Sequence, residues 1–188
     1  MLCGNIMINR VVELLKQEGL VNDGNDQIVK TGLQKLAHII SDIIFTVVCS
    51  CFLGDIVAGL VYGTGYGILR IYAGGYHAKS KMVCTVLTYL SILVSLLAIF
   101  YVPYNRYIIY FLLAVCICVI VCAAPVESEN KPLSKLEKRI FYRYCVGILL
   151  AEVLLCCVFV GLGFGLYAKA VSIAILQVVI GMGVVKRR

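Results

Sequence analysis

The residues best suited to chemistry in this 188-residue chain lie close together, between Arg70 and Cys84. Cys84 stands just inside the start of an apolar run, and His77 precedes it by seven positions, after a Gly-Gly pair and between basic residues. A thiol beside an imidazole suits acyl transfer, because the imidazole accepts the thiol proton and the thiolate attacks a carbonyl. The pattern therefore predicts Cys84 as a nucleophile and His77 as its base.

The position of Cys84 on a helix supports this prediction. If Ser80 caps the helix, Cys84 is about its fourth residue, only ~6 Å along the axis, and its side chain leans back toward the amino end. The helix amino terminus and the neighbouring Lys79 and Lys81 place positive charge there, which stabilises a thiolate. Glycine accepts turn geometries that other residues resist, so Gly74 and Gly75 allow the loop to bring the imidazole to the sulfur.

The elements that must hold this pair are membrane helices. With 62% hydrophobic and only 14% charged residues, the chain does not have the composition of a soluble domain. Nearly uncharged runs occur at 36–53, 55–69, 82–102, 107–124, 144–164 and 166–185. Most of them reach the roughly 18–20 residues that a helix needs to cross the hydrocarbon layer. The sequence thus predicts an all-α polytopic membrane protein with about six spans. The second span is short and glycine-rich, and we therefore expect it to be tilted, broken or re-entrant.

The distribution of basic residues predicts the orientation of these spans. With the amino terminus inside, fifteen Lys and Arg residues fall on the cytoplasmic side, and only Arg106 and Lys169 lie near the other face. Such a bias is the usual sign of orientation in the membrane. We therefore expect a multi-pass protein of the bacterial cell membrane with both termini and the 70–84 segment cytoplasmic. The net charge of +7 then reflects this bias and contact with anionic membrane lipid, not a nucleic-acid partner.

Two regions are expected along the chain. Residues 1–35 form a cytoplasmic amphipathic segment, in which Ile8, Val11, Val12 and Leu15 repeat at helical spacing. This segment is either an anchor helix or a platform for a substrate at the membrane surface. Residues 36–188 form a single transmembrane helical domain, with a catalytic segment at 70–84 and a cytoplasmic loop at 125–143.

The remaining cysteines and ionisable residues suggest no metal site and no cofactor. Most of the ten cysteines lie inside apolar runs, where a thiol behaves as a small hydrophobic group, and the two histidines are too few for a zinc site of the usual spacing. Placing an ionisable residue in lipid costs free energy. Those within the apolar runs therefore either pair with one another or extend their charged ends to the membrane surface, or else they line a polar path for a proton or product. They are His38, Asp42, Asp55, Glu152 and Lys169.

Two segments carry a resemblance to a known family. The first reads Arg70-x-x-Ala73-Gly74-Gly75-Tyr76-His77-Ala78 and is followed by Cys84; the second reads Ala124-Pro125-Val126-Glu127, then Asn130-Lys131-Pro132-Leu133. Together with the chain length and span pattern, they resemble the accessory gene regulator B (AgrB) family of integral-membrane cysteine endopeptidases. The resemblance implies an AgrD-type propeptide as substrate, Cys84 as nucleophile and His77 as base.

The resemblance also implies the reaction. Cys84 forms a thioester with the propeptide as its carboxyl-terminal tail leaves, and a propeptide thiol or hydroxyl then closes a thiolactone or lactone ring for quorum sensing. Arg70 is a candidate to bind a substrate carboxylate or carbonyl, and Tyr76 and Ser80 are candidates to orient the base. Lys131, Lys135 and Lys138 are expected to meet the acidic tail of such a propeptide, although positive-inside bias alone also accounts for them.

Two other classes of function remain open on the residues alone. A small membrane exporter would show corresponding repeats with broken helices around a midplane site, and no clear repeat is present. A scaffold without chemistry would not need the histidine and cysteine in this arrangement. The glycine-rich second span is of the kind that packs helices closely, which is compatible with a homodimer.

Overall fold

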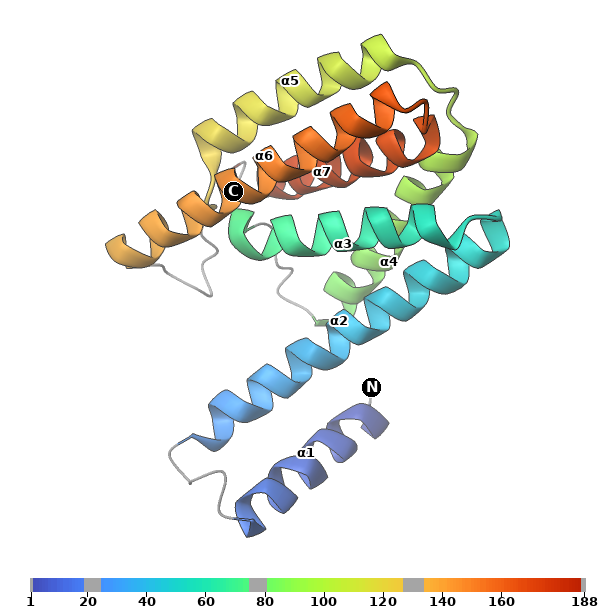
Figure 1. The fold of residues 1–188 in the computed structure, drawn as a ribbon. Helices are drawn as coiled ribbons and strands as arrows, with labels where there is room; N and C mark the ends of the chain where they lie inside the picture. Colours follow the sequence, from blue (N-terminus) through green and yellow to red (C-terminus); the bar gives the residue numbers. More distant parts are fainter. Residues whose placement is uncertain (1, 19–24, 75–80, 127–133, 187–188) are drawn as a thin grey trace. The chain divides into compact units, whose positions relative to one another are not determined.

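The computed structural model describes residues 2–18, 25–74, 81–126 and 134–186, and in these ranges the chain is almost entirely helical (Figure 1). The helices are α1 (Leu2–Gln17), α2 (Asp26–Leu53), α3 (Ile56–Ala73), α4 (Lys81–Tyr101), α5 (Arg106–Ala123), α6 (Lys135–Gly161) and α7 (Gly165–Lys186). Within the described ranges, six of them, α2 to α7, are long and apolar enough to cross a membrane. The predicted all-α, membrane-spanning architecture is thereby confirmed.

The chain forms two compact units, Met1–Phe45 and Thr46–Arg188. In the first unit, α1 carries the predicted apolar stripe: Val12 is buried and Leu15 is half-buried, whereas Val11 is 38% exposed. The ammonium group of Lys16 lies 3.1 Å from a carboxylate oxygen of Asp26, at the start of α2. This unit therefore consists of the α1 helix and the first part of α2, joined by an ion pair.

Two helices begin well before the apolar runs that predicted them. The α2 helix starts at Asp26 and α6 starts at Lys135, whereas the corresponding runs begin at 36 and 144. Hydropathy marks only the part of a helix that is suited to lipid, and Lys, Gln and Glu are good helix formers that extend it into water. At α6 a capping box also fixes the start, because the Ser134 side chain accepts from the Glu137 backbone N–H and the Glu137 side chain accepts from the Ser134 backbone N–H.

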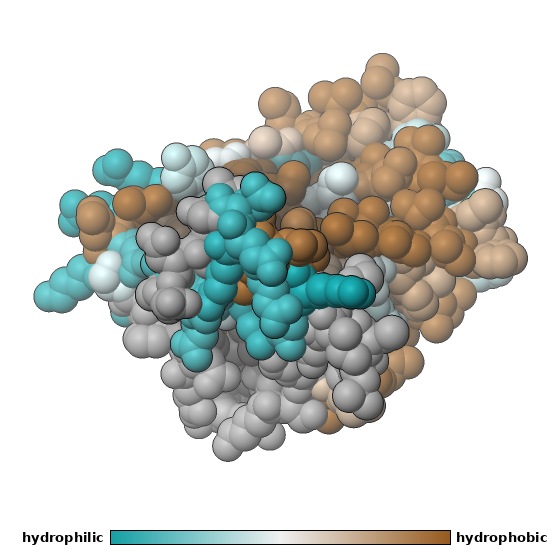
Figure 2. Space-filling view, turned by 90° about the horizontal axis from the view of Figure 1, so that it is seen from below, coloured by the Kyte–Doolittle hydropathy of each residue, from teal (hydrophilic) through white to brown (hydrophobic). Residues whose placement is uncertain are grey.

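The second unit is organised around α7, which packs against α3, α4, α5 and α6. Its inward side chains are fully or almost fully buried, among them Ala168, Ala174, Ile175, Val178 and Met182. Large apolar side chains on α2 to α6 are instead exposed, such as Phe52 at 88% and Phe111 at 73%. Figure 2 shows the broad hydrophobic areas that result. Such a surface is unfavourable in water and suits a lipid environment.

The short glycine-rich span, α3, is one unbroken helix of 18 residues, so the broken and re-entrant alternatives do not apply to it. Its glycines allow neighbouring helices to approach. A side chain at Gly59 would overlap Ser50 of α2, and one at Gly63 would lie 3.4 Å from the Thr46 methyl group. Gly65 lies against Glu152 of α6 in the same way. The expectation that these glycines serve close helix packing is confirmed.

Two of the ionisable residues in the apolar runs have local partners at the end of the bundle opposite Arg70. Asp55 caps α3 by accepting from the Ala58 N–H at 2.9 Å, and the Tyr167 hydroxyl donates to its other oxygen at 3.3 Å. Lys169 donates to the Val102 carbonyl oxygen at 2.7 Å. These contacts agree with the structural interpretation of both residues.

Candidate functional site

The predicted nucleophile, Cys84, is the fourth residue of α4, as its expected helical position requires. Its side chain is half-buried, and its carbonyl oxygen accepts a hydrogen bond from the Thr88 hydroxyl at 2.9 Å. The other members of the predicted site in this loop, Gly75, Tyr76, His77 and Ser80, lie outside the described residues, as does Lys131. The contact between His77 and Cys84 therefore stays a prediction.

The two segments that resemble the AgrB family meet at Gly74. Gly74 ends α3 with φ 75° and ψ −165°, a conformation that glycine adopts and other residues resist. Gly74 forms a parallel bridge with Val126, and the Val126 N–H donates to the Ala73 carbonyl oxygen at 3.0 Å. A β-carbon on Gly74 would overlap the Val126 carbonyl oxygen. The absence of a side chain at Gly74 is thus what allows the segment after α5 to join the end of α3.

Arg70 lies one turn before this junction, half-buried between α3 and α7. Its guanidinium carbon stands 5.7 Å from the centre of the Tyr66 ring, a cation–π distance. The guanidinium also packs directly on Gly181 of α7, where a side chain would overlap it. The α3 and α7 helices therefore hold this positive charge near their carboxyl ends.

Aromatic contacts attach the start of α6 to the same end of α3. The Tyr72 ring meets Phe141 edge-on, with ring centres 5.9 Å apart, and lies 5.3 Å from Tyr144. The Tyr142 hydroxyl reaches the Val121 carbonyl oxygen of α5 at 3.4 Å. The first turns of α6 are consequently packed near the Gly74–Val126 junction.

These first turns of α6 carry the basic residues that the sequence singled out. Lys135 and Lys138 are exposed, together with Arg139 and Arg143. A hydrophilic area lies over this projecting end of α6, at the left of Figure 2. The structure therefore presents several cations on the helix that follows the second family-like segment.

A buried polar network was not predicted from the sequence. The amide oxygen of Gln177 on α7 accepts from the Tyr62 hydroxyl of α3 and from the Ser95 hydroxyl of α4, the latter at 2.9 Å. Its amide nitrogen donates to the Ser91 hydroxyl at 2.8 Å. One signal was present: Cys84, Thr88, Ser91 and Ser95 recur at helical spacing along one face of α4. That pattern could have indicated a polar partner inside the bundle.

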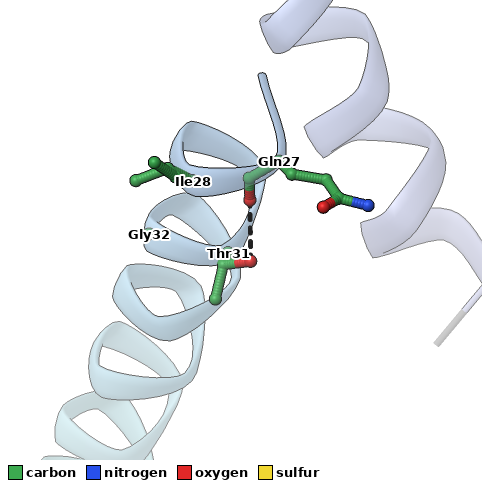
Figure 3. Close-up of a pocket in the computed structure, with 4 residues that line it drawn as sticks. All are labelled: Gln27, Ile28, Thr31 and Gly32. Carbon is green, nitrogen blue, oxygen red and sulfur yellow. Dashed lines mark hydrogen bonds between the residues drawn. The ribbon is translucent and has the colours of Figure 1, made fainter. Parts of the chain in front are cut away.

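The first unit has two shallow hollows of its own. One hollow is lined by Gln27, Ile28, Thr31 and Gly32, and within it the Thr31 hydroxyl donates to the Gln27 carbonyl oxygen at 2.8 Å (Figure 3). A second, lined by residues of α1 and α2 that include Glu13 and Lys16, is also open. Neither contains a residue of the predicted site.

Comparison with known proteins gives a family match over most of the chain. A family model described as Accessory gene regulator B matches residues 8–182, a range that includes the Gly74–Val126 junction and Cys84. A curated protein of Lactiplantibacillus plantarum, named "Putative AgrB-like protein", is 33% identical over 61 residues. This stretch covers 32% of the chain and 30% of that protein, so the chain matches less than a third of the relative's length. No solved structure gives a significant match.

Proposed function

Because this chain belongs to the AgrB family, we propose that it is a membrane-embedded cysteine endopeptidase of peptide quorum sensing. It removes the carboxyl-terminal tail of an AgrD-type propeptide and promotes closure of the remaining peptide into a ring. Cys84 is the nucleophile and His77 is the base. The observation that carries the proposal is the place of Cys84, in the first turn of a helix that is long and apolar enough to cross a membrane.

The reaction has two acyl transfers. His77 accepts the thiol proton, the Cys84 sulfur adds to the scissile carbonyl, and the C–N bond breaks as the imidazolium returns the proton to the departing amine. The propeptide is then a thioester of Cys84. A thiol or hydroxyl of the propeptide attacks this thioester, a new C–S or C–O bond forms, and Cys84 leaves as the thiol. Neither step requires a metal or a cofactor.

Ring closure has to compete with hydrolysis. Exchange of one thioester for another is nearly balanced in energy, so the outcome depends on holding the internal nucleophile against the carbonyl and on excluding water. A site at the edge of the hydrocarbon layer meets both needs, since the bilayer limits water on one side.

Other residues of the site bind and orient. Backbone N–H groups in the first turn of α4 point toward its amino end, where they stabilise the oxyanion that forms at the carbonyl. Tyr76 and Ser80 orient His77, and the turn at Gly74 and Gly75 brings the histidine toward the sulfur. Arg70 binds a carboxylate or carbonyl of the propeptide, which its position at the end of α3 supports.

The proposed activity is tested by co-expressing the chain with its AgrD-type propeptide and measuring the masses of the products. We expect a free tail peptide and a shortened propeptide whose mass is one water below that of the linear acid, because ring closure retains no water. Intact propeptide inside the cell, or intact propeptide outside it, would contradict peptidase activity, and the second result would favour an exporter.

The orientation in the membrane follows from the charges, with both termini and the 70–84 and 125–143 segments cytoplasmic. On a background without reactive cysteines, Lys135→Cys should react with a membrane-impermeant maleimide only after the cells are permeabilised. Arg106→Cys, on the exposed start of α5, is the matched control and should react in intact cells. Reaction of position 135 from outside intact cells would reverse the orientation.

The basic segment around the start of α6 binds the propeptide tail. Lys131, Lys135 and Lys138 follow the segment that joins α3 at Gly74, and propeptides of this family characteristically end in an acidic tail. Opposite charges across an interface select partners and set register. Exposed pairs contribute only about 0.2–1 kcal/mol each, so single substitutions have small effects and combined ones larger effects.

Charge reversal at all three lysines separates this role from positive-inside bias. We expect Lys131→Glu, Lys135→Glu and Lys138→Glu together to slow cleavage of an acidic tail by roughly tenfold, the sum of several weak pairs, and to speed cleavage of a tail with reversed charge. Insertion is checked by the maleimide assay at Arg106→Cys. Equal cleavage of both tails by both enzymes would leave the lysines as orientation signals only.

A further inference from the structure

The helix that carries Cys84 has a continuous polar face. The Thr88 hydroxyl donates to the Cys84 carbonyl oxygen at 2.9 Å, and the Ser91 hydroxyl donates to the Thr88 carbonyl oxygen at 2.8 Å. Ser95 continues the face one turn further and is 8% exposed. The Thr88 and Ser91 hydroxyls donate within α4, whereas the buried Ser95 hydroxyl donates to another helix, since a buried hydroxyl is expensive unless it is satisfied.

Gln177 on the central helix is the acceptor of the Ser95 hydroxyl. It is 8% exposed, its nitrogen donates to Ser91 at 2.8 Å and its oxygen accepts from Ser95 at 2.9 Å. The Tyr62 hydroxyl of α3 donates to the same oxygen. One side chain thus joins α3, α4 and α7 in the interior of the bundle, and a hydrogen-bonded buried network of this kind favours a single arrangement of its helices.

The position of Gln177 along α4 gives it influence over Cys84. The nearly fully buried residues of α4 are Ile92, Ser95, Leu96 and Ile99, all in its second half. Between positions 82 and 90 every described residue of α4 is half-buried or exposed. Gln177 therefore bonds α4 at the point where this helix leaves the packed core. Cys84 lies seven residues before Ser91, or about 10 Å nearer the start of the helix.

The two serines also fix the rotation of α4 about its own axis. Ser91 and Ser95 are four residues apart and so share one face of α4, and successive residues of an α-helix turn by about 100°. At the level of Gln177, this face of α4 places one hydroxyl at each end of the amide. Any other rotation of α4 would leave Gln177 unsatisfied and turn the Cys84 side chain away from its present direction.

We propose that Gln177 is a positioning residue for the endopeptidase reaction: by bonding Ser91 and Ser95 it sets the rotation of α4 that presents Cys84 to the scissile carbonyl. This inference rests on the proposed function. Gln177 itself touches no reacting atom and acts through the helix.

The test uses the full chain in liposomes with an AgrD-type propeptide as substrate and measures kcat, KM and Tm. Gln177→Leu removes the amide and leaves the Tyr62 and Ser95 hydroxyls without their acceptor, so both Tm and kcat should fall. Adding Tyr62→Phe and Ser95→Ala removes these hydroxyls as well, and Tm should return toward the wild-type value because no buried polar group is then unsatisfied.

The expected result is that kcat stays on the order of tenfold to a hundredfold low in the triple variant, with KM unchanged, since a misplaced nucleophile slows chemistry without weakening binding. Ser172→Ala is the matched control. Ser172 is also buried on α7 but bonds to Ala168 and Cys156, and its loss should leave kcat as in the wild type.

Recovery of kcat together with Tm in the triple variant would overturn the positioning role, because the network would then be structural only. Wild-type kcat in Gln177→Leu would overturn it too. Cys84→Ala, run alongside, separates the two proposals. If cleavage is lost there, the proposed function stands and the Gln177 variants alone decide the positioning role. Cleavage that persists overturns the proposed function and the positioning role with it.

Discussion

Replacing Cys84 with alanine is expected to abolish propeptide cleavage while the protein still inserts in the membrane. In the proposed mechanism the substitution removes the atom that forms the thioester, so the loss should be roughly 10³-fold or more, as for catalytic nucleophiles in general. Packing should change little, because Cys84 is half-buried and the hydrogen bond from Thr88 uses its backbone carbonyl, which alanine keeps. The free tail peptide is measured by mass spectrometry.

Two further variants make this result specific. Cys118→Ala removes an exposed thiol of α5 and should leave cleavage unchanged. Cys84→Ser keeps the size of the side chain and should still lose most activity, because a hydroxyl is a far weaker nucleophile than a thiolate here. A tail peptide that accumulates normally with Cys84→Ala would exclude the thioester mechanism.

Replacing Gly74 with alanine is the second substitution with a large expected effect. An alanine there would hold a positive φ at ψ −165°, which costs roughly 1–3 kcal/mol, and its methyl group would overlap the Val126 carbonyl oxygen. The junction between the two family-like segments should therefore open. We expect cleavage to fall by on the order of tenfold to a hundredfold, since each ~1.4 kcal/mol corresponds to a factor of ten.

Hydrogen exchange distinguishes opening of this junction from general unfolding. The Val126 N–H, which donates to Ala73 at 3.0 Å, should exchange much faster in Gly74→Ala, whereas amides in the core of α7 should keep their protection. Gly67→Ala is the matched control, because Gly67 lies in the same helix with open space around it, and cleavage should be unchanged. Normal Val126 protection and normal cleavage in Gly74→Ala would show that the junction tolerates a side chain.

The membrane helices and the place of Cys84 on one of them were predictable because both depend on local properties. The length of an apolar run against the thickness of the hydrocarbon layer decides whether a helix can span it, and this requires no knowledge of neighbours. The starts of α2 and α6 were less accurate. Their first turns are polar, and hydropathy does not distinguish a helix in water from a loop.

The continuity of α3 could not be predicted from the sequence, for a different reason. Glycines weaken a helix, and the short span with Gly59, Gly63, Gly65 and Gly67 was predicted to be tilted, broken or re-entrant. In lipid, backbone groups have no water to bond with, so the helix persists, and the missing side chains admit Ser50, Thr46 and Glu152. Whether a glycine breaks a helix or packs one thus depends on its neighbours.

Residue types and their distances along the chain were enough to predict the solvent of this protein, its helical spans and a thiol in the first turn of α4. The junction of Val126 with Gly74 and the bonds of Gln177 to Ser91 and Ser95 emerge only when the helices are packed together. These residues are separated by 52 positions in the first case and by more than 80 in the second. Such contacts depend on how whole helices pack. Hydropathy is compatible with many arrangements of the same helices, and side-chain packing and buried hydrogen bonds determine which of them is most stable.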